Sequence, residues 1–161
     1  MANSITSRDL SITSTSYAGI YVYDGISAQT IATGTTPVLL TCFNQTTGFN
    51  GLFYDCTPVK TGNKITVTRA GVYKIAYSIS FSQSGTNQVF ELYAFNGGVQ
   101  VAATGAQTKT VNNTDVKCCS AIGFATVAAN TDIDLRGYHD AVGNIDMTVT
   151  HTNFVVMRVG N

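Results

Sequence analysis

The sequence predicts an all-β protein, an antiparallel β-sandwich, and three observations support this. β-Branched residues dominate: the chain has 24 Thr, 16 Val and 11 Ile but only six Leu and one Glu, and branching at Cβ favours strands. Short apolar runs alternate with Gly, Asn and Asp turn residues, as in sandwiches and barrels. No helical pattern of useful length is present. The 161 residues suit one domain, and we expect a polar N-terminal arm over residues 1–16 and the sandwich over residues 17–161.

Eight runs after the arm have strand character, and turn residues such as Asp24-Gly25, Thr61-Gly62-Asn63 and Asn96-Gly97-Gly98 separate them. They cover residues 18–23, 37–43, 64–68, 71–82, 88–95, 116–127, 132–138 and 145–159, the last with a break near residue 151. Alternation in 71–82 places one core stripe on a single face, made of Tyr73, Ile75, Tyr77, Ile79 and Phe81.

The second faces of the long strands lack the polar residues of a wet sheet face. In 71–82 this face is mostly small, in 116–127 one face runs Cys119, Ala121, Gly123, and in 145–159 the last part is apolar on both faces, with Phe154 and Val156 against Val155, Met157 and Val159. An antiparallel sheet with one solvated face should instead alternate apolar with polar residues. Further copies of the chain are the simplest cover, and cover by loops of the same chain is the alternative.

Four segments together resemble the tumour-necrosis-factor and complement globular-head superfamily. Gly71-Val72-Tyr73 is similar to the family's Gly-x-Tyr central strand, and Tyr93 to Gly98 to its Tyr-x-Asn-Gly hairpin. Residues 128–135 resemble its turn into the penultimate strand, with Asn-Thr-Asp in place of Gly-Asp, and residues 154–159 its last strand. The resemblance implies a ten-stranded jelly roll that forms a homotrimer, with one sheet facing the threefold axis.

The resemblance also implies which residues face that axis. By position they are Lys74, Ala76, Ser78, Cys119, Ala121, Gly123, Asn153, Val155 and Met157. Lys74 departs from the pattern, because a charge near an axis needs an anion or water as a partner.

Stand-alone chains of this family with a short polar arm resemble tailed-phage virion proteins. We therefore expect a non-enzymatic structural protein, a trimeric decoration knob on the outside of a phage capsid, made in the host cytoplasm. Its partner would be the major capsid protein or another virion protein. The arm would anchor it, through Ser4, Ile5, Arg8, Leu10 and Ile12. The alternative is the tip of a phage fibre that binds a host glycan through loops such as 46–55, with Tyr21, Tyr23, Tyr54 and Tyr138 as candidate aromatic platforms.

Other function classes find little support. The net charge is +0, which argues against nucleic acid as a partner. No apolar run is long enough to span a membrane, and the N-terminus has no export signal. Enzyme motifs are missing, and His139 and His151 are expected to be a loop residue and a strand-break residue rather than catalytic bases. No cofactor is implied.

Two sites stay open. Cys42 and Cys56 flank a Gly/Asn-rich loop and form either a disulfide or two free thiols. Asp132 and Asp134 project from one strand face with Arg136, so they form either part of a calcium site or a solvated Asp/Asp/Arg face, and the second interpretation is favoured.

Overall fold

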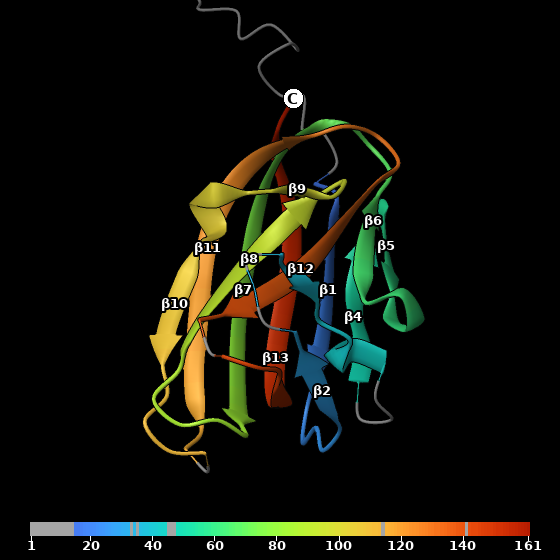
Figure 1. Cartoon of the computed structure of the whole chain (residues 1–161). Helices are drawn as coiled ribbons and strands as arrows, with labels where there is room; N and C mark the ends of the chain where they lie inside the picture. The colour runs from blue at the N-terminus through green and yellow to red at the C-terminus, as the bar shows by residue number, and fades with distance from the viewer. Residues whose placement is uncertain (1–14, 33, 35, 45–47, 114, 141) are drawn as a thin grey trace, which may run out of the picture.

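The computed structural model describes residues 15–32, 34, 36–44, 48–113, 115–140 and 142–161, and it contains two antiparallel sheets packed face to face (Figure 1). Sheet A comprises β1 (Tyr17–Val22), β2 (Ala28–Ile31), β4 (Gly48–Tyr54), β7 (Gly71–Gln83), β11 (Lys117–Val127) and β13 (Ile145–Gly160). Sheet B comprises β3 (Val38–Leu39), β5 (Cys56–Val59), β6 (Lys64–Val67), β8 (Val89–Asn96), β9 (Val99–Gln100), β10 (Ala106–Lys109) and β12 (Thr131–His139). Three 3₁₀ turns connect them: η1 (Cys42–Asn44), η2 (Lys60–Gly62) and η3 (Ala102–Thr104).

The strand order confirms the ten-stranded sandwich. Sheet A runs β11-β7-β13-β1-β4 and sheet B runs β10-β8-β12-β6-β5. The short strands β2, β3 and β9 are additions beside these two paths.

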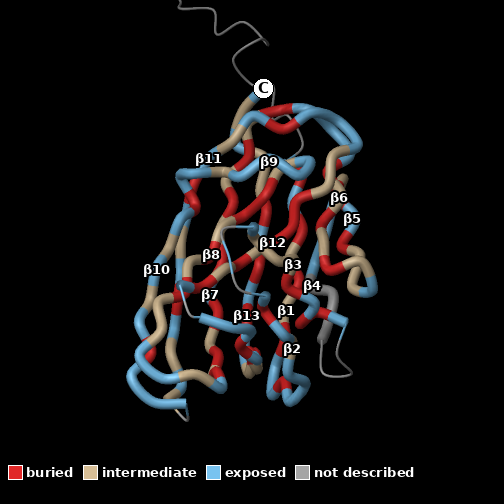
Figure 2. The backbone as a smooth tube through the Cα atoms, viewed as in Figure 1, coloured by how far each residue is buried: buried red, intermediate tan, exposed pale blue. Residues whose placement is uncertain are grey.

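The predicted core stripe on β7 is confirmed. Its five side chains are at most 4% exposed and pack against sheet B residues such as Phe90, and Figure 2 shows the buried residues between the sheets. The hydroxyl of Tyr77 lies 2.7 Å from the Leu92 carbonyl oxygen and 2.9 Å from that of Thr104. Tyr77 therefore links sheet A to β8 and η3 across the sandwich.

The expected break near His151 is a β-bulge. The pairing of β13 with β7 shifts register between Val149 and His151. One extra residue reverses which side chains face inward. Val149 is buried before the bulge, whereas Phe154 and Val156 are buried after it, so Val155 points away from the core.

Two expectations about residues 37–55 are wrong. The predicted strand 37–43 is a strand only over β3, because the chain then turns through η1 and buries Cys42 and Phe43 in the core. The described part of the predicted loop 46–55 is mostly strand β4, which pairs with β1. Backbone pairing with β1 outweighs the turn preference of the Gly and Asn residues in this segment.

The two ends of the sandwich differ in what they carry. The Arg158 backbone N–H donates to the Ser16 carbonyl at 2.7 Å, so the start of the described chain lies beside the C-terminus. We call this the arm-proximal end. The β1–β2, β7–β8 and β10–β11 connections lie at the opposite, distal end (Figure 1).

Candidate functional site

The outer face of sheet A, which points away from the core, carries rows of exposed apolar side chains. The strand register places Phe124, Lys74, Met157, Tyr17 and Tyr54 side by side in one row. The next row toward the distal end contains Ile122, Ala76, Val155 and Gly19. Ile122 is 60% exposed, Phe124 58% and Val155 42%. We call this surface the sheet A face.

Two hollows mark the sheet A face. The larger, about 530 Å³, is lined by side chains that include Ala76, Ser78, Ser120, Ile122, Asn153 and Val155. The smaller, about 270 Å³, lies over β1 between β4 and β13 and is lined by residues that include Tyr17, Gly19, Leu52 and Val155. A Cβ atom at Gly19 would lie 3.5 Å from Val155 Cγ2, so the absence of a side chain there opens the smaller hollow.

The sheet A face changes from apolar to polar along the strands. Below the Ile122 row, toward the distal end, the outward side chains are Ser78, Ser120, Asn153, then Ser80, Cys118 and His151. Cys118 Sγ lies 3.0 Å from Ser80 Oγ, and the His151 ring meets Tyr23 edge-on at 5.1 Å. The apolar surface is therefore concentrated in the arm-proximal half.

The structure corrects three of the expected axis-facing residues. Cys119, Ala121 and Gly123 point into the sandwich: Cys119 is 4% exposed, and Ala121 packs on the core. A Cβ atom at Gly123 would lie 2.8 Å from the Ala103 backbone. These side chains are small because η3 packs closely against β11, whereas the outward face of β11 carries the larger Ile122 and Phe124.

The other six residues of that set lie on the sheet A face, as expected: Lys74, Ala76, Ser78, Asn153, Val155 and Met157. Their role at an interface between copies stays a prediction. The predicted arm residues Ser4, Ile5, Arg8, Leu10 and Ile12 lie outside the described residues.

The outer face of sheet B is polar, and the two aspartates of β12 on it are paired with cations. Asp132 accepts hydrogen bonds from Lys64 Nζ at 2.6 Å and Thr66 Oγ1 at 2.7 Å. Burial opposes the charged form of Asp132, but these hydrogen bonds outweigh it and lower the pKa of the carboxyl group. Asp134 forms a bidentate ion pair with Arg136 at 2.8 and 3.0 Å.

The calcium interpretation of Asp132 and Asp134 therefore has no geometric support. Each carboxylate is neutralised by its own cation, and the Arg136 guanidinium also lies 4.6 Å from the centre of the Phe95 ring. Within the described ranges, no three His, Cys, Asp or Glu residues are placed to hold a metal ion together.

The only glutamate of the chain is the centre of a second polar cluster on sheet B. Glu91 accepts hydrogen bonds from Tyr138 at 2.6 Å, Tyr93 at 2.8 Å and Gln107 at 3.1 Å. The bonds from the two tyrosines lower the pKa of Glu91, and the same carboxylate raises the pKa of Tyr138. Tyr138, a candidate sugar platform, is stacked on Tyr93 with ring centres 6.1 Å apart.

His139 is a core residue, not the expected loop residue. It ends β12, is 2% exposed, and its Nε2 lies 2.9 Å from the Ile31 carbonyl oxygen. His151 lies at the bulge, as expected, and is exposed.

All four cysteines are free thiols in the structure. Of the two alternatives for Cys42 and Cys56, the structure therefore has two free thiols and no disulfide. Burial raises the pKa of Cys42 to about 12 and that of Cys56 to about 11. The pKa of Cys119 is likewise raised to about 11. Cys118 alone of the four is exposed.

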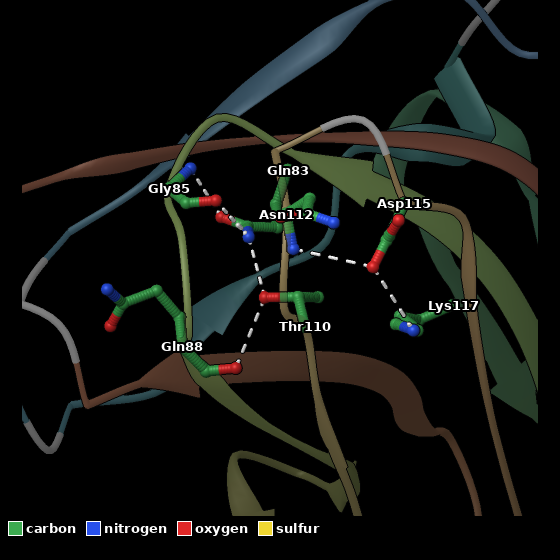
Figure 3. A network of polar contacts seen from close by, with 7 residues as sticks. All are labelled: Gln83, Gly85, Gln88, Thr110, Asn112, Asp115 and Lys117. Atoms are coloured by element: carbon green, nitrogen blue, oxygen red, sulfur yellow. Dashed lines mark hydrogen bonds and ion pairs between the residues drawn. The ribbon is translucent and has the colours of Figure 1, made fainter.

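A polar network joins the distal connections (Figure 3). Gln83 Nε2 donates to Thr110 Oγ1 at 2.6 Å, and the Thr110 backbone N–H donates to the Gln88 carbonyl at 2.9 Å. In the β10–β11 connection, Asp115 pairs with Lys117 at 3.4 Å. These bonds fix the β7–β8 and β10–β11 connections relative to each other.

Comparisons with known proteins find solved structures with a similar fold but no similar sequence. No protein-family model matches the chain, and no curated protein matches its sequence. Among solved structures, the globular domain of zebrafish complement 1qA superposes with a TM-score of 0.59 at 10% identity, covering 91% of this chain and 99% of that chain. The Eiger TNF of S. frugiperda gives 0.57 at 10% identity, with coverage of 91% and 94%. Murine APRIL gives 0.53 at 10% identity, with coverage of 90% and 99%.

No helix in the described part of the chain has the length and apolarity to cross a membrane. The two sheets, their strand order and the structural matches together assign the chain the jelly-roll fold of TNF-like proteins and complement globular heads.

Proposed function

We propose that the protein is a non-enzymatic structural knob that acts as a homotrimer, with copies meeting through the sheet A face. The observation that carries this proposal is the apolar half of that face, where Ile122 and Phe124 on β11 and Val155 on β13, the two strands that flank β7, are 42–60% exposed. A contiguous exposed apolar patch of this kind marks an interaction surface. The described loops of the chain leave it open.

The outer face of sheet B provides the contrast. Asp132 and Asp134 on this face are paired with cations within the chain, and the hydroxyls of Tyr93 and Tyr138 are hydrogen-bonded to Glu91. Such a face is stable in water and gains little from being covered. The fold shared with TNF and complement globular heads supports association through sheet A, since trimers are typical of these folds.

We further propose that the knob decorates the outside of a phage capsid and that residues 1–16 attach it there. The arm joins the domain at one end of the sandwich, beside Arg158. A short arm binds weakly alone because it loses conformational entropy when it becomes ordered. Three linked arms gain avidity, which compensates for that loss.

The molar mass of the protein in solution, measured by light scattering, tests the association. A mass of three chains supports the proposal, and a single-chain mass at all accessible concentrations refutes it. Deleting residues 1–14 tests the anchor and leaves Ser16, which bonds to Arg158, in place. The shortened chain should still have the mass of three chains in solution, and it should no longer bind purified capsids. Capsid binding at full strength without the arm refutes the anchoring role.

A fibre tip that binds a host glycan is the second candidate. It is favoured by the distal end, which lies away from the arm and whose connections are held together by Gln83 and Thr110. Tyr23, 64% exposed in the distal β1–β2 connection, offers further contact surface. Adsorption of the arm-deleted chain to host cells, without capsid binding by the full chain, supports this candidate.

A further inference from the structure

Lys74 is an isolated charge on the sheet A face. We consider the outward side chains of β1, β7, β11 and β13 between the row of Lys74 and the row of Ser80. Among those that the structure describes, Lys74 is the only charged one. Its row neighbours are Phe124 and Met157. It is half-buried, and no residue that the structure describes forms a hydrogen bond or ion pair with it.

A second copy offers no unpaired side-chain carboxylate to Lys74 from the described part of its own sheet A face near the Lys74 row. Four aspartates that the structure describes already form ion pairs within their own chain: Asp55 with Arg69, Asp115 with Lys117, Asp132 with Lys64 and Asp134 with Arg136. Asp146 lies on sheet A but at the distal end, where it accepts a hydrogen bond from Thr30. An ammonium group that loses its water without gaining a partner opposes association strongly.

Hydrogen-bond donors lie on the same face as Lys74, two rows toward the distal end and about 13 Å along the strand, a distance that a lysine side chain and a small anion can span together. The larger hollow begins at Ala76, about 7 Å along the strand from Lys74. Ser78, Ser120 and Asn153 line it, and their side chains have no partner among the described residues. Two hydroxyls, one amide and one ammonium group, with no carboxylate among them, match an anion rich in acceptor oxygens.

We propose that the assembled protein binds a small oxyanion, such as phosphate or sulfate, at Lys74 and the adjoining hollow, and that this anion strengthens the association of the copies. The inference rests on the proposed association through the sheet A face. The anion supplies the charge that Lys74 lacks, and its oxygens accept hydrogen bonds from the serine and asparagine side chains. The copies enclose the site and exclude water from it.

Dissociation of the full-length chain on dilution, followed by light scattering in sodium sulfate and in sodium chloride at equal ionic strength, tests the proposal. Sulfate also favours burial of apolar surface in general, so two variants separate the effects. Lys74→Met keeps most of the side-chain length and removes the charge. Lys109→Met is the matched control, because Lys109 is exposed on β10 of sheet B.

We expect sulfate to lower the concentration of half-dissociation of the unmodified protein and of Lys109→Met by about tenfold relative to chloride. Lys74→Met should associate more tightly than the unmodified protein in chloride, and its response to sulfate should be clearly smaller. An equal sulfate response in all three proteins overturns the anion site while leaving the association intact. A single-chain mass in both salts refutes the association itself.

Discussion

Replacing Ile122 by Asp tests the role of the sheet A face directly. Complete burial of an isoleucine side chain contributes about 1.5–3 kcal/mol. Because Ile122 is 60% exposed in the single chain, covering it contributes about 1–2 kcal/mol per copy, or roughly 3–5 kcal/mol for three copies. For an equilibrium between monomer and trimer, this raises the concentration of half-dissociation by about 10- to 60-fold. Desolvation of the new carboxylate adds to the effect.

The assay is light scattering over a dilution series, with far-ultraviolet circular dichroism to establish that the variant folds. Val99→Asp is the matched control, since Val99 is 70% exposed but lies on β9 of sheet B. The control should keep the mass of the unmodified protein. If Ile122→Asp dissociates no more readily than Val99→Asp, the sheet A face is not where copies meet.

Three further predictions concern the core and the thiols. Tyr77→Phe should lower the free energy of unfolding by about 1–3 kcal/mol, measured by denaturant titration at fixed protein concentration. Tyr23→Phe is the control, because Tyr23 is 64% exposed, and it should change this free energy by less than about 0.5 kcal/mol. Equal effects of the two variants would contradict the link across the sandwich. Cys119→Asp should prevent folding and Cys118→Asp should not, as judged by circular dichroism; the reverse result would mean that the faces of β11 are misassigned. Burial raises the pKa of the Cys42 thiol from 9.0 to about 12. Above pH 9 this thiol therefore loses its proton in the unfolded chain but keeps it in the folded chain. The free energy of unfolding should fall as the pH rises from 9 to about 12, by up to about 1.4 kcal/mol per pH unit. Cys42→Ala should make that fall shallower, and an unchanged slope would contradict the assignment.

The long strands were predictable because their alternation is strong and local. β7, β8, β12 and β13 lie within one or two residues of their expected bounds. The break at His151 was also predictable, since the apolar positions of this segment change parity there. Central strands are determined by their own burial pattern, so the sequence carries most of the information about them.

The edge strands β4, β5 and β10 were not predictable in the same way, whereas the long edge strand β11 lies within one residue of its expected bounds. β4 contains Gly48 and Gly51 and owes its extended form to pairing with β1, which is distant in sequence. β5 and β10, only four residues each, were also missed. Strand formation in such segments depends on the partner strand more than on intrinsic propensity.

The error on β11 has a physical cause. A strand face made of small residues can pack closely against another subunit or against a segment of its own chain, and composition alone does not distinguish the two. Here η3 covers Gly123, with the Ala103 backbone 2.8 Å from the position of a Cβ atom. The decisive feature of the outward face is instead the bulk of Ile122 and Phe124, which a solvated strand would seldom expose side by side.

The position of the arm is consistent with association through sheet A. The long strands of that sheet run between the arm-proximal and distal ends (Figure 1). If three copies meet through their sheet A faces about an axis roughly parallel to these strands, rotation about the axis keeps every Ser16 at the same end. All three arms then reach one attachment surface together, and all the distal connections, including the Gln83 and Thr110 network, point away from it. The apolar half of the face lies at the same end as Ser16, so under the proposed association the interface would be strongest at the end from which the arms start.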